Sequence, residues 1–115
     1  MKKFLKGFKY AFEGILSALK SERNLKIHFI VMILVIVFGF VFEISKTEWI
    51  ICIILFGIVI SGELFNTAIE TVVDMISLEK NDRAKKAKDV SAGAVLVLAI
   101  ASVIIGLIIF IPKIF

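Results

Sequence analysis

Three long apolar runs are the feature that most limits the folds open to this 115-residue chain. They extend from about Leu25 to Ile44, from Trp49 to Gly62 with a partly polar continuation to Val73, and from Val90 to Ile111. A helix needs about 20 apolar residues to cross a bilayer. The strictly apolar cores of the first two runs are shorter, so these runs also fit buried or re-entrant segments. We predict three spans, because long side chains at the ends of a run can extend a short span.

The composition places the chain in the same class. Hydrophobic residues make up 60% of the chain, and its length leaves room for one domain. We therefore predict an all-α integral membrane protein with an N-terminal amphipathic helix at the membrane surface and three transmembrane helices. The predicted segments are the interfacial helix 1–24, the first span 25–44, the second span with its cytoplasmic extension 48–73, the cytoplasmic loop 74–89 and the third span 90–112.

Basic residues are distributed unevenly around the spans. Residues 1–28 contain seven Lys or Arg and residues 74–89 contain five, whereas residues 43–48 and the C-terminal end contain one each. The positive-inside rule predicts that the N-terminus and residues 74–89 are cytoplasmic and that the C-terminus lies outside. The net charge of +4 then reflects the membrane flanks, and no nucleic-acid partner is expected, since no separate basic groove with interleaved aromatic residues is present.

The N-terminal segment has the pattern of an interfacial helix, with an apolar face opposite a lysine-rich one. The apolar face comprises Phe4, Leu5, Phe8, Phe12, Ile15, Leu16 and Leu19. If the helix continues, Glu22 returns to this apolar face, where its carboxylate needs a partner. The alternative is that the helix ends near Lys20 and that Glu22 is solvated.

A polar stripe interrupts the second run, in the pattern Glu63-x-x-Asn66-x-x-x-Glu70-x-x-x-Asp74. At about 100° per residue these side chains share one face of a helix. Ionisable groups inside a membrane cost about 2.5–3.5 kcal/mol each on insertion scales, so they persist mainly where they pair, bind ions or line a wet site. The stripe therefore marks a candidate functional site.

Two further charged residues, Lys88 and Asp89, lie at the mouth of the third span, near the depth of Glu70 and Asp74. Carboxylates beside a lysine suit Mg²⁺ carrying phosphates, because Mg²⁺ prefers oxygen ligands. Glu63 and Glu70 are about 10.5 Å apart along a helix axis and are too distant to share one ion. This separation predicts that one binds metal while the other acts on an acceptor hydroxyl. Ion or proton transport, or a purely structural role, fits the acids equally well.

Two segments together resemble the prokaryotic diacylglycerol kinase family, and in particular its Gram-positive undecaprenol kinase branch. They are Gly62-Glu63-Leu64-Phe65-Asn66-Thr67-Ala68-Ile69-Glu70 and Ala87-Lys88-Asp89-Val90-Ser91-Ala92-Gly93-Ala94-Val95. Ser21-Glu22-Arg23-Asn24-Leu25 also looks like that branch. The resemblance covers nearly the whole chain. It implies a bacterial plasma-membrane enzyme that transfers the γ-phosphoryl group of ATP to undecaprenol, with diacylglycerol as the alternative acceptor.

The resemblance also implies roles for individual residues. Glu63 would be the catalytic base, Asn66 would orient the base and the lipid substrate, and Glu22 with Glu70 would bind Mg²⁺. The implied ATP-binding residues are Tyr10, Glu22, Glu70, Asp74, Glu79, Lys88 and Asp89. In the turn at 79–81, Lys80 and Asn81 depart from the aromatic and histidine residues of the diacylglycerol branch. The resemblance further implies a homotrimer with sites at subunit interfaces, so Glu22 and Glu70 could come from different chains.

Four other residues receive structural interpretations. His28 is expected to be an interfacial residue at the start of the first span, outside the site. Trp49 is expected to anchor the opposite interface, and Pro112 to end the last helix. The single cysteine, Cys52, lies within a span without a partner, which excludes a disulfide.

Overall fold

The computed structural model describes residues 1–77, 79 and 81–115. Within these residues the chain forms four α-helices: α1 (Lys2–Ser21), α2 (Arg23–Val41), α3 (Lys46–Ile76) and α4 (Asp82–Ile114). The prediction of an all-α fold is therefore confirmed. Helices α2, α3 and α4 are each long and apolar enough to cross a membrane, in agreement with the three predicted spans.

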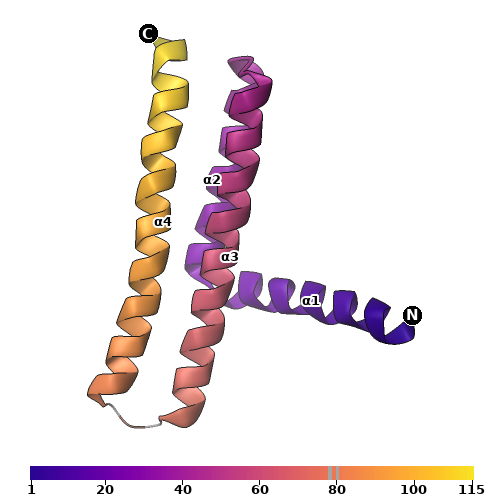
Figure 1. The fold of residues 1–115 in the computed structure, drawn as a ribbon, viewed down its shortest axis with the longest axis vertical. Helices are drawn as coiled ribbons and strands as arrows, with labels where there is room; N and C mark the ends of the chain where they lie inside the picture. The colour runs from indigo at the N-terminus through magenta and orange to yellow at the C-terminus, as the bar shows by residue number, and fades with distance from the viewer. Residues whose placement is uncertain (78, 80) are drawn as a thin grey trace.

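The three long helices stand side by side, and α1 projects away from them (Figure 1). The most extensive contact joins α3 to α4, while α2 packs on α3. Helix α1 meets the others only near its C-terminal end, and its apolar residues, including Phe4, Phe8 and Phe12, are exposed. We call the end where α3 passes to α4 the α3–α4 end, and the opposite end the α2–α3 end.

The junction between α1 and α2 is a sharp break at Glu22. Its backbone is extended (φ −103°, ψ 112°), and its N–H donates to the carbonyl of Ala18 at 2.8 Å, which closes the last turn of α1. The unbroken helix considered above is therefore wrong, and α1 ends at Ser21. The Glu22 side chain is nevertheless half-buried, so it is not the fully solvated group of the alternative. Leu25, with no exposed surface, fixes the start of α2 against its neighbours.

A short connection at 42–45 joins α2 to α3. Glu43 adopts a left-handed conformation (φ 52°). Ser45 and Glu48 then form a capping box, in which the Ser45 hydroxyl accepts from the Glu48 N–H at 3.1 Å and the Glu48 carboxylate accepts from the Ser45 N–H at 2.9 Å. The Lys113 ammonium lies 3.0 Å from the same carboxylate, so one residue both starts α3 and ties α4 to it.

Helical structure extends further than the sequence interpretation placed it. Residues 74–76 continue α3, and α4 begins at Asp82, where the Asn81 side chain accepts from the Ala84 N–H at 2.8 Å. The prediction that Pro112 ends the last helix is wrong, because α4 continues to Ile114. A proline in the final turn removes only one backbone hydrogen bond, and the Phe115 N–H still donates to the Ile111 carbonyl at 3.1 Å. Where the membrane boundaries cut these helices stays a prediction.

The α2–α3 end is packed around Ile44, Cys52 and Ile109. Gly39 allows α2 to approach Trp49 there, since a Cβ atom on Gly39 would lie 2.5 Å from Cη2 of the Trp49 ring. The aromatic ring of Phe40 packs on the same indole, with its centroid 4.9 Å away. The indole is therefore held from two neighbouring positions of α2 and has little room to move.

We expect Gly39→Ala to destabilise the fold. Forcing a methyl group into such a contact costs about 1–3 kcal/mol, although alanine itself favours a helix over glycine. Gly106→Ala is the matched control, because nothing lies within 4 Å of the added methyl. Thermal unfolding in detergent should show a lower midpoint for Gly39→Ala only. Equal midpoints for the two variants would contradict the packing described.

Candidate active site

Polar side chains gather on α3 from its middle toward the α3–α4 end. Glu63, Asn66 and Glu70 follow one another along one face of the helix, as the spacing predicted. Glu63 is buried, with only 3% of its surface exposed. Within the described residues, Glu63 and Ser91 are the buried polar residues of the molecule. A carboxylate so enclosed needs a polar partner.

That partner is His28 on α2. Its Nε2 atom lies 3.1 Å from Oε1 of Glu63, and its side chain is 22% exposed. The sequence interpretation left His28 outside the site, yet the structure brings it into contact with the residue predicted to be the base. A lone histidine at the start of an apolar run carries no sequence signal for this contact, because the rotation of α2 against α3 decides it.

A chain of hydrogen bonds links α4 to Glu70 through Asn66. The Ser91 hydroxyl donates to Oδ1 of Asn66 at 2.7 Å, and Nδ2 of Asn66 donates to Oε1 of Glu70 at 3.2 Å. Each atom of the Asn66 amide therefore has a partner of the correct type. Ser91 is a second residue that the sequence interpretation did not assign to the site. In the sequence, the only indication of this role is that Ser91 follows Lys88 by about one helical turn.

Beyond Glu70, the site opens toward the α3–α4 end with an ion pair between Asp74 and Lys88. The hydrogen bond to Asp74 raises the pKa of Lys88, and the charges of Asp74 and Glu70 add to this effect against a partial loss of solvation. The ammonium group is consequently held in its charged form beside two carboxylates. Lys85 and Asp89 pair separately on α4, at 2.6 Å.

A cavity of about 570 Å³ lies next to this ion pair. Asp74, Glu79 and Lys88, three of the predicted ATP-binding residues, line it together with Ser77 and Asn81. The turn is shaped by the Ser77 hydroxyl, which donates to the Glu79 carbonyl at 2.6 Å and accepts from the Asn81 side chain at 2.8 Å. Lys80 lies outside the described residues.

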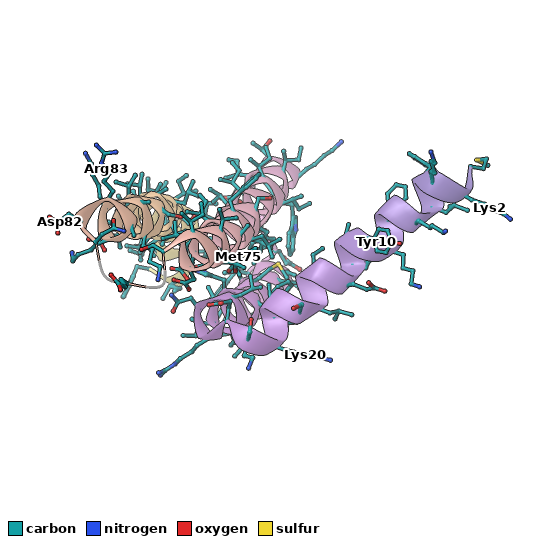
Figure 2. All side chains as sticks on the ribbon, turned by 90° about the horizontal axis from the view of Figure 1, so that it is seen from below. Lys2, Tyr10, Lys20, Met75, Asp82 and Arg83 are labelled. Atoms are coloured by element: carbon teal, nitrogen blue, oxygen red, sulfur yellow. The ribbon has the colours of Figure 1, made fainter. Side chains whose placement is uncertain are left out.

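Other predicted site residues lie apart within the single chain. Tyr10 is exposed on α1, away from the ends of α3 and α4 that carry Met75 and Asp82 (Figure 2). Glu22 lies at the α1–α2 junction. Within residues 1–77, 79 and 81–115, no three His, Cys, Asp or Glu side chains are close enough together to hold a metal ion.

The donor chemistry nevertheless fits a hard cation held jointly with phosphates. Glu70 is half-buried and uses Oε1 for Asn66, and no hydrogen bond occupies its Oε2 among the described residues. Mg²⁺ commonly takes one or two carboxylates and fills its other positions with water and phosphate oxygens. A free oxygen on Glu70 and the half-buried carboxylate of Glu22 match that demand.

An apolar groove of about 510 Å³ runs between α2, α3 and α4. It extends from His28 and Ile60 to Phe42, Phe110 and Ile114 near the α2–α3 end. His28 is thus shared between the groove and Glu63. The groove suits an apolar chain whose polar end stops beside the buried carboxylate.

The chain is similar in sequence to known proteins. Residues 9–110 match the family described as prokaryotic diacylglycerol kinase. The chain is 45% identical to an undecaprenol kinase from Bacillus subtilis, over 98% of this chain and 92% of that protein. It is 37% identical to a diacylglycerol kinase from Synechocystis sp. (89% of this chain, 59% of that protein) and 33% identical to one from Haemophilus influenzae (89% and 87%). The chain therefore belongs to the prokaryotic diacylglycerol kinase family, as its sequence motifs predicted, and is a membrane lipid kinase.

Proposed function

We propose that this protein is an undecaprenol kinase, which transfers the γ-phosphoryl group of ATP to the hydroxyl group of undecaprenol. The observation that carries the proposal is a buried carboxylate, Glu63, linked through His28 to an apolar groove on one side and followed by Asn66 and Glu70 on the other. The 45% identity to an undecaprenol kinase favours this acceptor over diacylglycerol.

In the proposed mechanism Glu63 accepts the proton of the lipid hydroxyl as its oxygen attacks the γ-phosphorus. Asn66, held by Ser91, fixes the carboxylate of Glu70 and orients the acceptor. Phosphoryl transfer depends mainly on positioning and on neutralising charge, so a base, a lysine and a metal site suffice. Mg²⁺ held by Glu70 and Glu22 would neutralise the phosphate oxygens.

Nucleotide binding is assigned to the cavity at the α3–α4 end. Lys88 would exchange its contact with Asp74 for the phosphates, because an ammonium group binds them as a point charge. Asp74 and Glu79 line the same cavity, and Asp89 follows Lys88 on α4. The chain has neither a P-loop sequence nor a glycine-rich kinase loop, so side chains and metal would hold the phosphates in place of a backbone cradle.

We expect Lys88→Met to weaken ATP binding about tenfold or more, because a hydrogen bond to a charged group contributes about 1.5–3 kcal/mol. Lys86→Met is the matched control, since Lys86 is exposed on α4 and is not among the residues that line the cavity. Titration of the purified protein with a fluorescent ATP analogue measures both. Equal losses in the two variants would argue against a specific role for Lys88.

The proposed membrane arrangement follows the charge distribution. The N-terminus and residues 74–89 would face the cytoplasm of a bacterial cell, and α1 would lie in the interface with its exposed phenylalanines in the lipid. This orientation brings the cavity at the α3–α4 end to the side from which ATP arrives.

A homotrimer would complete the site. In the single chain, Tyr10 on α1 is remote from the cavity that contains Lys88, so a neighbouring α1 is required to supply it. Mixing Glu22→Gln with Lys88→Met, at an ATP concentration at which each protein alone is strongly impaired, tests this arrangement. If sites are shared between chains, some mixed trimers contain an intact site and recover activity, whereas sites built within one chain recover none.

The acceptor is tested directly with purified protein in detergent, radiolabelled ATP and Mg²⁺, and undecaprenol and diacylglycerol in parallel. Faster transfer of label to undecaprenol supports the proposal. Faster transfer to diacylglycerol identifies the second candidate function, which the relatives from Synechocystis sp. and Haemophilus influenzae favour. Label in neither lipid would count against both.

A further inference from the structure

The direction of the hydrogen bond between His28 and Glu63 follows from the proposed role of Glu63 as a base, which requires an ionised carboxylate. An ionised carboxylate can only accept hydrogen bonds, so a bond to it requires a proton on Nε2 of the imidazole. The two atoms are 3.1 Å apart and join α2 to α3. Oε1 of Glu63 is the atom engaged, which leaves Oε2 as the oxygen available to a reacting hydroxyl.

Other polar groups near Glu63 are committed elsewhere. The Thr67 hydroxyl donates to the backbone carbonyl of Glu63 at 2.9 Å and does not engage the carboxylate. The amide of Asn66 makes its hydrogen bonds to Ser91 and Glu70, and not to the carboxylate of Glu63. Among the described residues, His28 is accordingly the side chain that makes a hydrogen bond to the carboxylate. Without it, rotation about the last side-chain bond of Glu63 would be restricted by packing alone.

We propose that His28 is a positioning residue for the base: it donates its Nε2 proton to Oε1 of Glu63 and thereby directs Oε2 toward the lipid hydroxyl. This inference rests on the proposed kinase function. In the step it supports, Oε2 takes the hydroxyl proton and a bond forms between the lipid oxygen and the γ-phosphorus. The bond from that phosphorus to the β–γ bridging oxygen breaks, and its electron pair leaves with ADP. His28 keeps its proton throughout.

The location of His28 supports this role. It lines the apolar groove and touches the base, so a hydroxyl that arrives along the groove meets the imidazole and the carboxylate together. A hydrogen bond that fixes the reacting group matters because a displacement of about 1 Å can cost on the order of 10²-fold in rate.

Three substitutions separate positioning from simple packing. His28→Leu removes the donor and keeps much of the volume. His28→Gln retains an amide donor near the position of Nε2, and His28→Asn has a donor that is too short to reach. Leu34→Met is the control, since Leu34 lies on α2 but does not line the groove.

We expect His28→Leu and His28→Asn to lower kcat about 10- to 100-fold with KM for ATP unchanged. His28→Gln should retain kcat within about threefold of the unmodified protein, and Leu34→Met should behave in the same way. In a Glu63→Gln background, His28→Leu should cause no further loss, because the group it positions is absent.

The inference is overturned if His28→Leu or His28→Asn keeps full kcat, if His28→Gln loses as much as His28→Leu, or if the losses of His28→Leu and Glu63→Gln add. Circular dichroism and thermal midpoints identify a variant that fails to fold. If His28→Leu fails to fold, the comparison of kcat between His28→Asn and His28→Gln decides whether the donor is needed. Unmodified protein that phosphorylates neither lipid would instead refute the kinase proposal, so the two failures are distinguishable.

Discussion

Glu63→Gln is expected to lower kcat for lipid phosphorylation by about 10²–10⁴-fold, the range that a general base contributes. ATP binding should be retained, because Glu63 lies outside the cavity that contains Lys88. The fold should also be retained, since the amide oxygen of glutamine can still accept a hydrogen bond from His28. Steady-state kinetics with both substrates varied, together with ATP titration, measure the separation between turnover and binding.

The control for this variant is Glu13→Gln, which removes the same charge from an exposed position on α1. It should leave kcat close to that of the unmodified protein. Near-normal turnover by folded Glu63→Gln protein would refute the assignment of the base. A fall in ATP affinity comparable to the fall in kcat would place Glu63 on the nucleotide instead of on the acceptor.

Glu70→Gln is expected to abolish most of the Mg²⁺-dependent part of ATP binding. A neutral amide is a much weaker ligand than a carboxylate for Mg²⁺, whereas it can still accept from Asn66, so the effect should be confined to the metal. We expect ATP affinity at a fixed Mg²⁺ concentration to fall about 10- to 100-fold, as for other losses at metal sites. Raising the Mg²⁺ concentration should recover part of it.

Asn66→Ala provides the comparison for Glu70→Gln. It removes the hydrogen bond to Glu70 and leaves the carboxylate charge in place. The dependence of ATP affinity on Mg²⁺ concentration should therefore change less in Asn66→Ala than in Glu70→Gln. ATP affinity measured across a series of Mg²⁺ concentrations distinguishes the two. An unchanged Mg²⁺ dependence in Glu70→Gln would exclude this carboxylate from the metal site.

The sequence predicted the part of the site that one helix determines. Glu63, Asn66 and Glu70 share a face because helical periodicity fixes their relative directions, whatever packs against them. The three spans were predictable for a similar reason, since the length of an apolar run sets whether it can cross the bilayer. The family motifs then indicated which chemistry those residues serve.

The contributions of α2 and α4 were not predictable in the same way. These helices are apolar on all sides within the spans, so hydropathy does not fix how each is rotated toward α3. The engagement of His28 with Glu63 and of Ser91 with Asn66 depends on that rotation. Where α1 ends was left open by the sequence, because the pattern of its apolar face continues through Glu22 whereas the backbone breaks there.

Helix ends illustrate a second limit. The charged residues after Asp74 indicated a loop, yet both helices continue into the segment that was predicted to be the loop. Asn81 did carry a usable signal, because its side chain caps α4 at a position where asparagine is favoured. Pro112 misled because a proline removes one hydrogen bond without always ending the helix, and the Phe115 N–H still donates to the Ile111 carbonyl in the last turn.

The brevity of the connection at 42–45 has a practical consequence for inhibition. In the proposed orientation this segment is the part of the α2–α3 hairpin that reaches the outer surface, and the capping box and the tie to Lys113 occupy its polar groups. The apolar groove reaches the same end at Phe42, Phe110 and Ile114. An apolar inhibitor is therefore expected to bind along the groove from the lipid, whereas a nucleotide analogue must cross the membrane and compete in the cytoplasm.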